Sequence, residues 1–126
     1  MTALELRRAI EKLLKDELGV FTTGTPAIWI EPPEMDAELQ TTGLRCVIYD
    51  VPIGSLTPMS AGQKLREEML VVDLVNFDRA RSLKVAKEKL ETALPQAKQP
   101  QYRPRTSRTL ETCRFWIYAP RVSNPL

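Results

Sequence analysis

The sequence predicts an α+β fold, with a four-stranded, mostly antiparallel sheet and two helices packed on one of its faces. Two segments place apolar residues at helical spacing, and four short segments have the alternation and the β-branched or aromatic content of strands. Along the chain the order is helix, strand, strand, long loop, strand, helix, strand. Strands joined by loops pair antiparallel, whereas a helical connection allows a parallel or skipped pairing. We expect residues 1–126 to form a single domain.

The two helices are expected at residues 2–18 and 78–94. Thr2 and Glu5 fit a capping box, in which each side chain accepts a hydrogen bond from a backbone N–H at the open helix end. Gly19 is expected to end this helix in a left-handed conformation. Asp78 is the expected N-cap of the second helix. Each helix therefore has one apolar side that needs to be buried against the sheet.

The expected strands are residues 25–31, 43–51, 66–77 and 110–118. In the third strand, alternation places Leu70, Val72 and Leu74 on one face, which we expect to meet the helices. The opposite sheet face carries more aromatic surface than a solvated face needs, and two interpretations stay open: loops fold over it, or another subunit covers it. Depending on the strand register, this second face carries Trp29, Val71, Val75, Phe77, Trp116 and Tyr118.

The connection at residues 52–64 is long, and it holds two prolines, two glycines and few large apolar residues. A loop of about a dozen residues inside a small domain is usually functional or mobile. Since it joins two strands, an extended hairpin arm is a plausible interpretation. The C-terminal tail, about residues 120–126, is expected to be frayed because it contains Pro120 and Pro125.

The residue types in this chain do not suggest catalysis. The sequence has no histidine, which removes the commonest general base and the commonest zinc ligand. Cys46 and Cys113 lie in predicted strands and are expected to be buried thiols rather than a disulfide or a metal site. No phosphate-binding loop, dinucleotide fingerprint or carboxylate-rich metal pattern is present. We therefore expect no catalytic residues, no metal site and no cofactor.

Two segments have opposite charge. The first, residues 31–38, contains only acidic charges, and the second, residues 96–109, contains only basic ones. Two interpretations stay open: both segments are solvated loops, or they pair head to tail between subunits and close a ring. The residues of this expected subunit interface are Glu31, Glu34, Asp36, Glu38, Lys98, Arg103, Arg105 and Arg108.

The basic segment also allows another interpretation. Its four positive charges surround Tyr102, as in a segment that contacts the nucleic acid backbone and stacks on a base. Lys98, Arg103, Arg105 and Arg108 would then contact DNA without regard to sequence, for example DNA that passes through a pore. The net charge of +2 does not favour nucleic acid by itself. No uncharged run is long enough to span a membrane, and Glu5 and Arg7 stand where a signal peptide would be apolar, so a cytoplasmic site of synthesis is expected.

The succession of elements resembles a known family. A capped N-terminal helix, a strand that ends at Pro32-Pro33, the strand GLRCVIYDV, a long loop, LREEMLVVDLVNFD leading into RSLKVAKEKLETALP, and a final TCRFWIYAPRV are similar to the tail terminator (tail completion) proteins of tailed bacteriophages. The resemblance covers about residues 2–120 and is one of element order and size.

The resemblance implies a structural virion protein of the tail and neck, assembled in the host cytoplasm. Such a protein forms a hexameric ring on the head-proximal end of the tail tube, stops tube polymerisation and docks to the head–tail connector. The tail tube protein, the connector protein and DNA in the pore would be its partners. The docking arm would be formed by Pro52, Ile53, Leu56, Pro58 and Met59. The alternatives are another phage neck or minor tail protein, or a small cytoplasmic module that binds nucleic acid or a protein.

Overall fold

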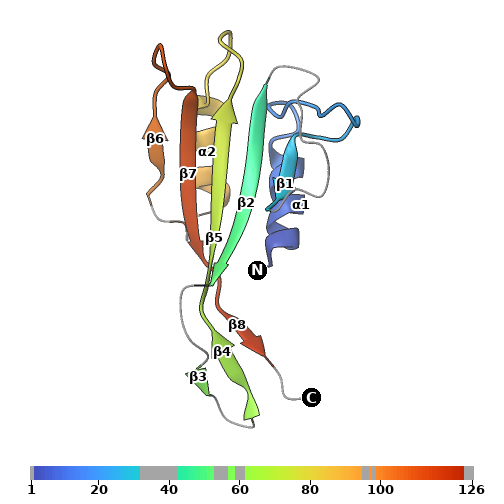
Figure 1. The fold of residues 1–126 in the computed structure, drawn as a ribbon, viewed down its shortest axis with the longest axis vertical. Coiled ribbons are helices and arrows are strands. Elements are labelled where there is room, and N and C mark those ends of the chain that lie inside the picture. Colours follow the sequence, from blue (N-terminus) through green and yellow to red (C-terminus); the bar gives the residue numbers. More distant parts are fainter. Residues whose placement is uncertain are drawn as a thin grey trace.

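The computed structural model describes residues 2–31, 43–52, 57–58, 62–94, 97 and 99–123, and it shows an α+β fold with two helices (Figure 1). The α+β class and the two helices are confirmed. The elements are α1 (Ala3–Leu13), β1 (Ile28–Ile30), β2 (Leu44–Pro52), β3 (Thr57–Pro58), β4 (Lys64–Arg66), β5 (Glu68–Asn76), α2 (Lys84–Ala93), β6 (Gln101–Arg103), β7 (Glu111–Tyr118) and β8 (Arg121–Ser123).

The main sheet is mixed and has five strands, in the order β1-β2-β5-β7-β6, where four were predicted. The three pairings β2–β5, β5–β7 and β7–β6 are antiparallel, and β1 lies parallel to β2. The additional strand, β6, lies in the basic segment, residues 96–109, where no strand is predicted. It is only three residues long and exposed, so it lacks the buried alternation that makes a strand recognisable.

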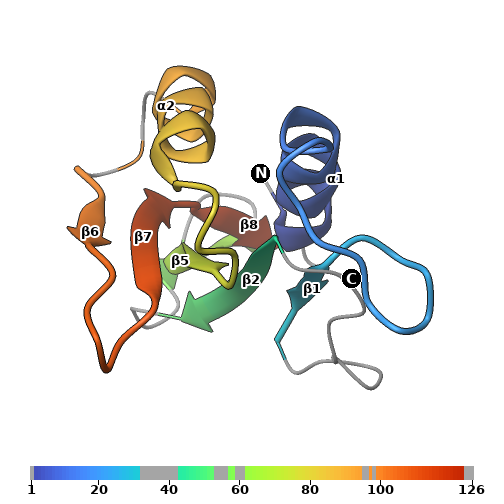
Figure 2. The same cartoon turned by 90° about the horizontal axis from the view of Figure 1, so that it is seen from above.

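Both helices lie on the same side of the main sheet (Figure 2). Leu70, Val72 and Leu74 are each at most 1% exposed on that side, as the alternation of β5 predicted. The same buried cluster includes Leu6, Ile10 and Leu14 at α1, Leu83, Ala86 and Leu90 at α2, and Cys113, Phe115 and Ile117 of β7. Each large apolar side chain buried there stabilises the fold by about 1.5–3 kcal/mol.

Helix α1 is shorter than predicted because the start of β2 captures the backbone that follows it. The helix ends at Leu13, and the chain then bends so that Gly19 N donates to Leu44 O at 2.9 Å and Leu44 N donates to Glu17 O at 3.1 Å. These bonds replace the last helical turn. The prediction of a left-handed Gly19 was wrong, because the positive φ angles of the described glycines are at positions 24, 43 and 62. Of the predicted capping box at the other end, the Thr2 half is confirmed, since Thr2 Oγ1 accepts from Glu5 N at 3.2 Å.

Helix α2 begins at Lys84, six residues later than predicted, and Asp78 is not its N-cap. The Asp78 side chain instead accepts a hydrogen bond from Ala80 N at 2.9 Å and forms a local turn before the helix. The N–H at the start of α2 is satisfied from β7, because Leu83 N donates to Glu111 Oε1 at 2.9 Å. A strand side chain therefore satisfies one N–H at this helix end, and Ser82 Oγ accepts another, from Lys84 N at 3.1 Å.

Glu111 is a buried carboxylate that joins four elements. Besides the Leu83 N–H, it accepts hydrogen bonds from Asn76 Nδ2 at 2.9 Å and from the hydroxyl of Tyr102. Asn76 ends β5 and Tyr102 is in β6, so the bonds tie α2, β5 and β6 to the first residue of β7. Burial by itself would raise the pKa of Glu111, but these hydrogen bonds and the positive charge of Arg105 outweigh burial and lower its pKa.

A second, smaller sheet has the order β3-β4-β8 and extends beyond one end of the main sheet (Figure 1); we call it the arm. Strand β3 and the first residue of β4 come from the predicted long connection, Arg66 of β4 belongs to the predicted third strand, and β3 and β4 pair antiparallel. The expectation of a frayed tail is wrong for residues 121–123, which form β8 and pair with β4. Pro120, the reason for that expectation, lacks only the N–H and does not stop the chain from pairing one residue later.

The arm continues the register of the main sheet. In β4–β8, Leu65 lies opposite Val122, and in β5–β7, Met69 lies opposite Tyr118, so the sum of the paired residue numbers is the same in both ladders. Between them Ala119 N donates to Glu68 O at 2.9 Å. Residues 64–76 and 111–123 are therefore one long antiparallel ribbon, interrupted where Pro120 has no N–H to donate.

Gly43 is expected to be the least replaceable of the described glycines. Its φ is +147°, and an added Cβ would lie 3.0 Å from Gly19 N and 3.1 Å from Gly19 Cα. Replacement of Gly43 by alanine should lower the free energy of unfolding by about 2–4 kcal/mol, because backbone strain and overpacking add. Gly24→Ala is the matched control, with a φ of +88° but nothing within 4 Å, and should cost only about 1 kcal/mol. Urea denaturation of both variants checks this, and equal costs would contradict it.

The lowered pKa of Glu111 predicts a loss of stability in acid. A carboxyl group whose pKa is lowered by folding contributes its full stabilisation at pH values above its ordinary pKa of 4.5. This contribution is lost as the pH falls through the folded-state pKa. Glu111→Gln should be about 1–3 kcal/mol less stable at pH 7 and should depend less on pH between 6 and 3. Glu88→Gln, on the exposed side of α2, should keep the wild-type pH dependence. Denaturation series across that range measure both slopes, and equal slopes for wild type and Glu111→Gln would refute the assignment.

Candidate interaction surface: the open sheet face and the two sheet edges

The face of the main sheet opposite the helices is a candidate interaction surface, and we call it the open face. Val47 and Val71 on it are only 5% and 8% exposed, although neither helix lies on that side. Both tryptophans of the chain also lie there. The strand registers place on this face Trp29, Arg45, Val47, Tyr49, Val51, Met69, Val71, Asp73, Val75, Gln101, Arg103, Thr112, Arg114, Trp116 and Tyr118, with Phe77 just beyond β5.

Arg45 is held between two aromatic rings on the open face. Its guanidinium carbon lies 4.6 Å from the ring centroid of Phe77 and 5.4 Å from that of Trp29. Its Nε is buried and, among the described residues, has no hydrogen-bond acceptor. An arginine that is held between two rings and lacks a carboxylate partner is preorganised to bind a carboxylate, because most of its side-chain freedom is already lost.

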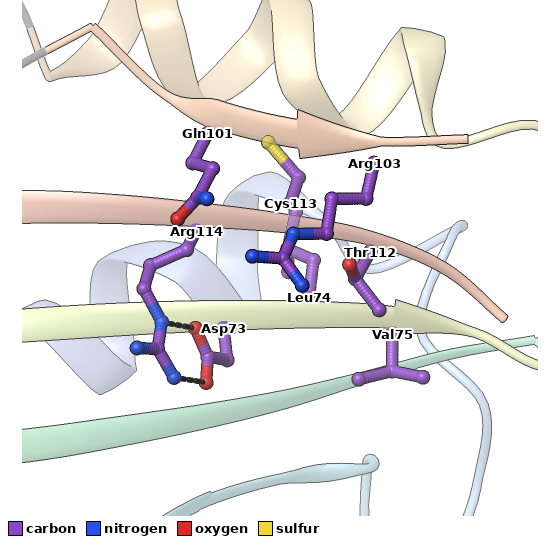
Figure 3. A pocket seen from close by; sticks show the side chains of 8 residues that line it. All are labelled: Asp73, Leu74, Val75, Gln101, Arg103, Thr112, Cys113 and Arg114. Atoms are coloured by element: carbon purple, nitrogen blue, oxygen red, sulfur yellow. Dashed lines mark hydrogen bonds and ion pairs between the residues drawn. The ribbon is translucent and has the colours of Figure 1, made fainter. Parts of the chain in front are cut away.

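A shallow polar pocket of about 250 Å³ lies beside this arginine, across β5, β7 and β6 (Figure 3). Asp73 and Arg114 cross its floor as a bidentate ion pair, with both N–O distances 2.6 Å. Arg103 extends over Thr112 from the outer strand. Arg114 is largely exposed, so the pair contributes little stability, about 0–1 kcal/mol, and its effect is to fix the direction of one positive and one negative group on the open face.

The two oppositely charged segments begin at opposite edges of the sheet. Glu31 directly follows the edge strand β1, and Arg103 ends the other edge strand, β6 (Figure 1). Glu31 is exposed and accepts a hydrogen bond from Trp29 Nε1 at 3.3 Å. Arg103 is exposed and lines the pocket. The other acidic residues of the predicted interface, Glu34, Asp36 and Glu38, lie outside the described residues.

The remaining basic residues differ in what they already bind. Arg105 is half-buried and donates to Asn76 O at 2.7 Å, so it supports the Glu111 network as well as carrying charge. Arg108 is exposed in a turn in which its N–H donates to Thr106 Oγ1 at 3.2 Å. Lys98 lies outside the described residues. Tyr102, whose ring would stack on a base in the nucleic-acid interpretation, donates its hydroxyl to Glu111.

The residues of the predicted docking arm are described only in part. Pro52 ends β2 and is exposed, and the backbone of Pro58 pairs with Lys64. Ile53, Leu56 and Met59 lie outside the described residues. The docking role of all five stays a prediction.

The two thiols are buried and far from being reactive. Burial raises the pKa of Cys113 to about 11 and raises the pKa of Cys46 further, so neither forms much thiolate near pH 7. Cys46 and Cys113 both lie opposite Leu74 but on either side of β5, about 9–10 Å apart by strand spacing, which is too far for a disulfide. Over the part of the chain that is described, no three Cys, Asp or Glu residues gather in a way that could hold a metal ion.

Comparison with models of protein families gives no match, and comparison with curated proteins gives no relative of significant similarity. Neither helix of the described chain has the length and apolar character that a membrane span requires. The open face and the two sheet edges are therefore the features that bear on the class of protein.

Two functional features were missed from the sequence. The enclosure of Arg45 depends on Trp29 in the neighbouring strand and on Phe77 near the end of another, so it requires the register of β1, β2 and β5. The only sequence signal was an arginine that alternates with apolar residues in a predicted strand. Within the basic segment, Arg105 binds the backbone carbonyl of Asn76, whereas Arg103 and Arg108 are exposed. This difference depends on the Glu111 network, and no local sequence pattern indicates it.

Replacement of Arg45 by a residue that keeps an apolar stem is expected to change the free energy of unfolding very little. In Arg45→Met, loss of two cation–π contacts, about 0.5–1 kcal/mol each, is offset by removal of a buried donor without acceptor, which costs about 1–3 kcal/mol. Arg45→Ala also loses the packing of the stem and should be less stable by at least about 1 kcal/mol. Urea denaturation compares the two, and equal destabilisation by both changes would show that the cationic contact dominates.

Proposed function

We propose that this chain is a tail terminator of a tailed bacteriophage, a structural protein that closes into a ring at the head-proximal end of the tail tube. In this proposal it stops tube polymerisation and presents a docking surface to the head–tail connector. It is not an enzyme, and it acts in the virion after assembly in the host cytoplasm. Another neck or minor tail protein, and a small nucleic-acid- or protein-binding module, are the competing assignments.

The observation that carries the proposal is the position of opposite charges on opposite sheet edges. A contact between two different surfaces of identical subunits is heterologous, and repetition of such a contact closes into a ring when the rotation suits. With Glu31 after β1 and Arg103 in β6, the acidic edge of one subunit can face the basic edge of the next without any subunit being turned over. Two like edges would instead favour a twofold dimer.

The edge strands themselves suit this arrangement. Among the described residues, β1 pairs only with β2, and β6 pairs only with β7. Unpaired edges present backbone N–H and C=O groups to a neighbouring chain, while charged residues at their ends discourage the wrong pairing. Each exposed ion pair contributes only about 0.2–1 kcal/mol. The charges would therefore set the register of neighbouring subunits, and most of the affinity would come from edge pairing and apolar burial.

The open face and the arm are consistent with contacts to other proteins. Tryptophan, tyrosine and arginine are enriched among the residues that carry binding energy at protein interfaces, and the open face holds all three types. The arm extends beyond the main sheet in one direction, as a contact to a protein above or below the ring would require (Figure 1). These features support a structural role over a catalytic one.

Charge reversal at one edge tests the ring. We expect a solution mass near six times 14.3 kDa, either for the free chain or after it meets the end of a tail tube. Arg103→Glu with Arg108→Glu should weaken assembly about tenfold, equivalent to about 1.4 kcal/mol, and added Glu31→Lys with Glu34→Lys should restore part of it. Arg105 is left unchanged because it supports the fold. Light scattering over a concentration series measures the mass.

Lys84→Glu with Arg79→Glu, two exposed changes away from the sheet edges, is the matched control and should assemble normally. A double reversal at Arg103 and Arg108 that assembles like wild type, or a compensating pair without effect, would reject the edge contact. If the reversal spares assembly but abolishes salt-sensitive binding to duplex DNA, the basic segment contacts nucleic acid instead. A chain that stays monomeric with and without tail tubes would reject the ring.

A further inference from the structure

A cleft of about 460 Å³ separates the exposed flank of α1 from the chain that returns to β1. One wall is a stripe of α1 at helical spacing, which comprises Arg8, Glu11, Lys12 and, just beyond the helix, Lys15. The other wall and the floor are largely apolar and comprise Leu18, Gly19, Val20, Gly24 and Pro26. The volume lies within the range of about 300–1,000 Å³ that is usual for binding sites.

The apolar wall is held in place by contacts behind it. Phe21 is 6% exposed, and its ring packs against that of Trp29 with centroids 5.5 Å apart. Phe21 N donates to Thr25 O at 2.8 Å, and Gly24 N donates to Phe21 O at 2.9 Å, which closes the turn. A ligand therefore would not have to order this wall, and the entropic cost of binding is correspondingly small.

The charge of the cleft is unbalanced. Three cationic side chains line it with a single carboxylate, that of Glu11. Within the described ranges, Arg8, Lys12 and Lys15 make no hydrogen bond or ion pair through their side chains. The cleft thus combines a preformed apolar surface with positive charges that are free to pair with a ligand.

We propose that this cleft binds an acidic, extended peptide segment of a protein partner, with an apolar side chain on the floor and carboxylates against Arg8, Lys12 and Lys15. The three cationic side chains favour carboxylates in the ligand. The apolar surface of Leu18, Val20 and Pro26 favours an apolar side chain between those carboxylates. The proposal concerns the isolated chain and does not rest on the ring.

A nucleic acid fits the same cleft less well. A duplex backbone has no apolar group to place on the floor. None of the lining residues is aromatic, so an unpaired base would have only the Arg8 guanidinium to stack on. Both differences can be measured.

The test uses two fluorescein-labelled peptides of equal charge, acetyl-EEELEEE and acetyl-EEESEEE, titrated with the whole chain at low salt in fluorescence anisotropy. We expect the leucine peptide to bind at least fivefold more tightly than the serine peptide. Lys12→Glu with Lys15→Glu should weaken the leucine peptide at least tenfold. Val20→Thr keeps the shape and the charge of the cleft and should reduce the preference for leucine.

The control is Arg7→Glu with Lys84→Glu, two charge reversals outside the cleft, one of them on the same helix; binding should change less than twofold. Circular dichroism checks folding, and Lys12→Gln with Lys15→Gln replaces the reversal if that variant unfolds. Equal binding of the two peptides, equal loss in the control, displacement by duplex DNA at equal phosphate and carboxylate concentrations, or no binding at millimolar protein would each overturn the proposal. Because the readout is peptide affinity of the single chain, its failure is distinct from failure of ring assembly.

Discussion

The second half of the fold depends on the hydrogen bonds that the buried carboxylate of Glu111 accepts. A charge of this kind is tolerated in a protein interior only when several donors surround it, and here the donors come from the end of β5, the start of α2 and the middle of β6. If one of those elements moved alone, the carboxylate would lose one of its hydrogen-bond donors. The short strand β6, which has little apolar surface of its own, is thereby kept in place beside β7 and defines one edge of the sheet.

The rest of the architecture follows from a sheet with two unequal faces. On one side the two helices complete an apolar core, and on the other side aromatic residues and Arg45 occupy a surface that neither α1 nor α2 covers. The sheet edges carry opposite charges, and α1 contributes a cleft on its outer flank. The stable half of the molecule thus serves as a rigid support, while the open face, the two edges and the cleft are available for contacts with other molecules.

Whatever depends on local periodicity could be predicted from the sequence, and whatever depends on contacts between distant segments could not. The class, the two helices and the buried face of β5 follow from the spacing of apolar residues. Asp78 was predicted as the N-cap because it precedes an apolar periodic run, but the N–H groups at the start of α2 donate to Ser82 and to Glu111, which lies 28 residues further along the chain from Leu83. Strands β6 and β8 are polar or short and become strands only because β7 and β4 offer them backbone partners. The aromatic residues expected on the open face are there, but the enclosure of Arg45 required a register that no local pattern encodes.

The unbroken register between the arm and the main sheet has a mechanical consequence. Strands β4 and β5 are separated by one residue, and β7 and β8 by two, so two continuous backbones run from the arm into the main sheet. Tension on the arm along these strands would pull β5 and β7 in the same direction. It would therefore load in parallel the hydrogen bonds that join this ribbon to β2 and β6, rather than opening them one after another. Sideways force would instead bend the ribbon at Pro120, where one rung of the ladder is absent. The arm is therefore stiff along its length and compliant across it, as a lever with a built-in hinge would be.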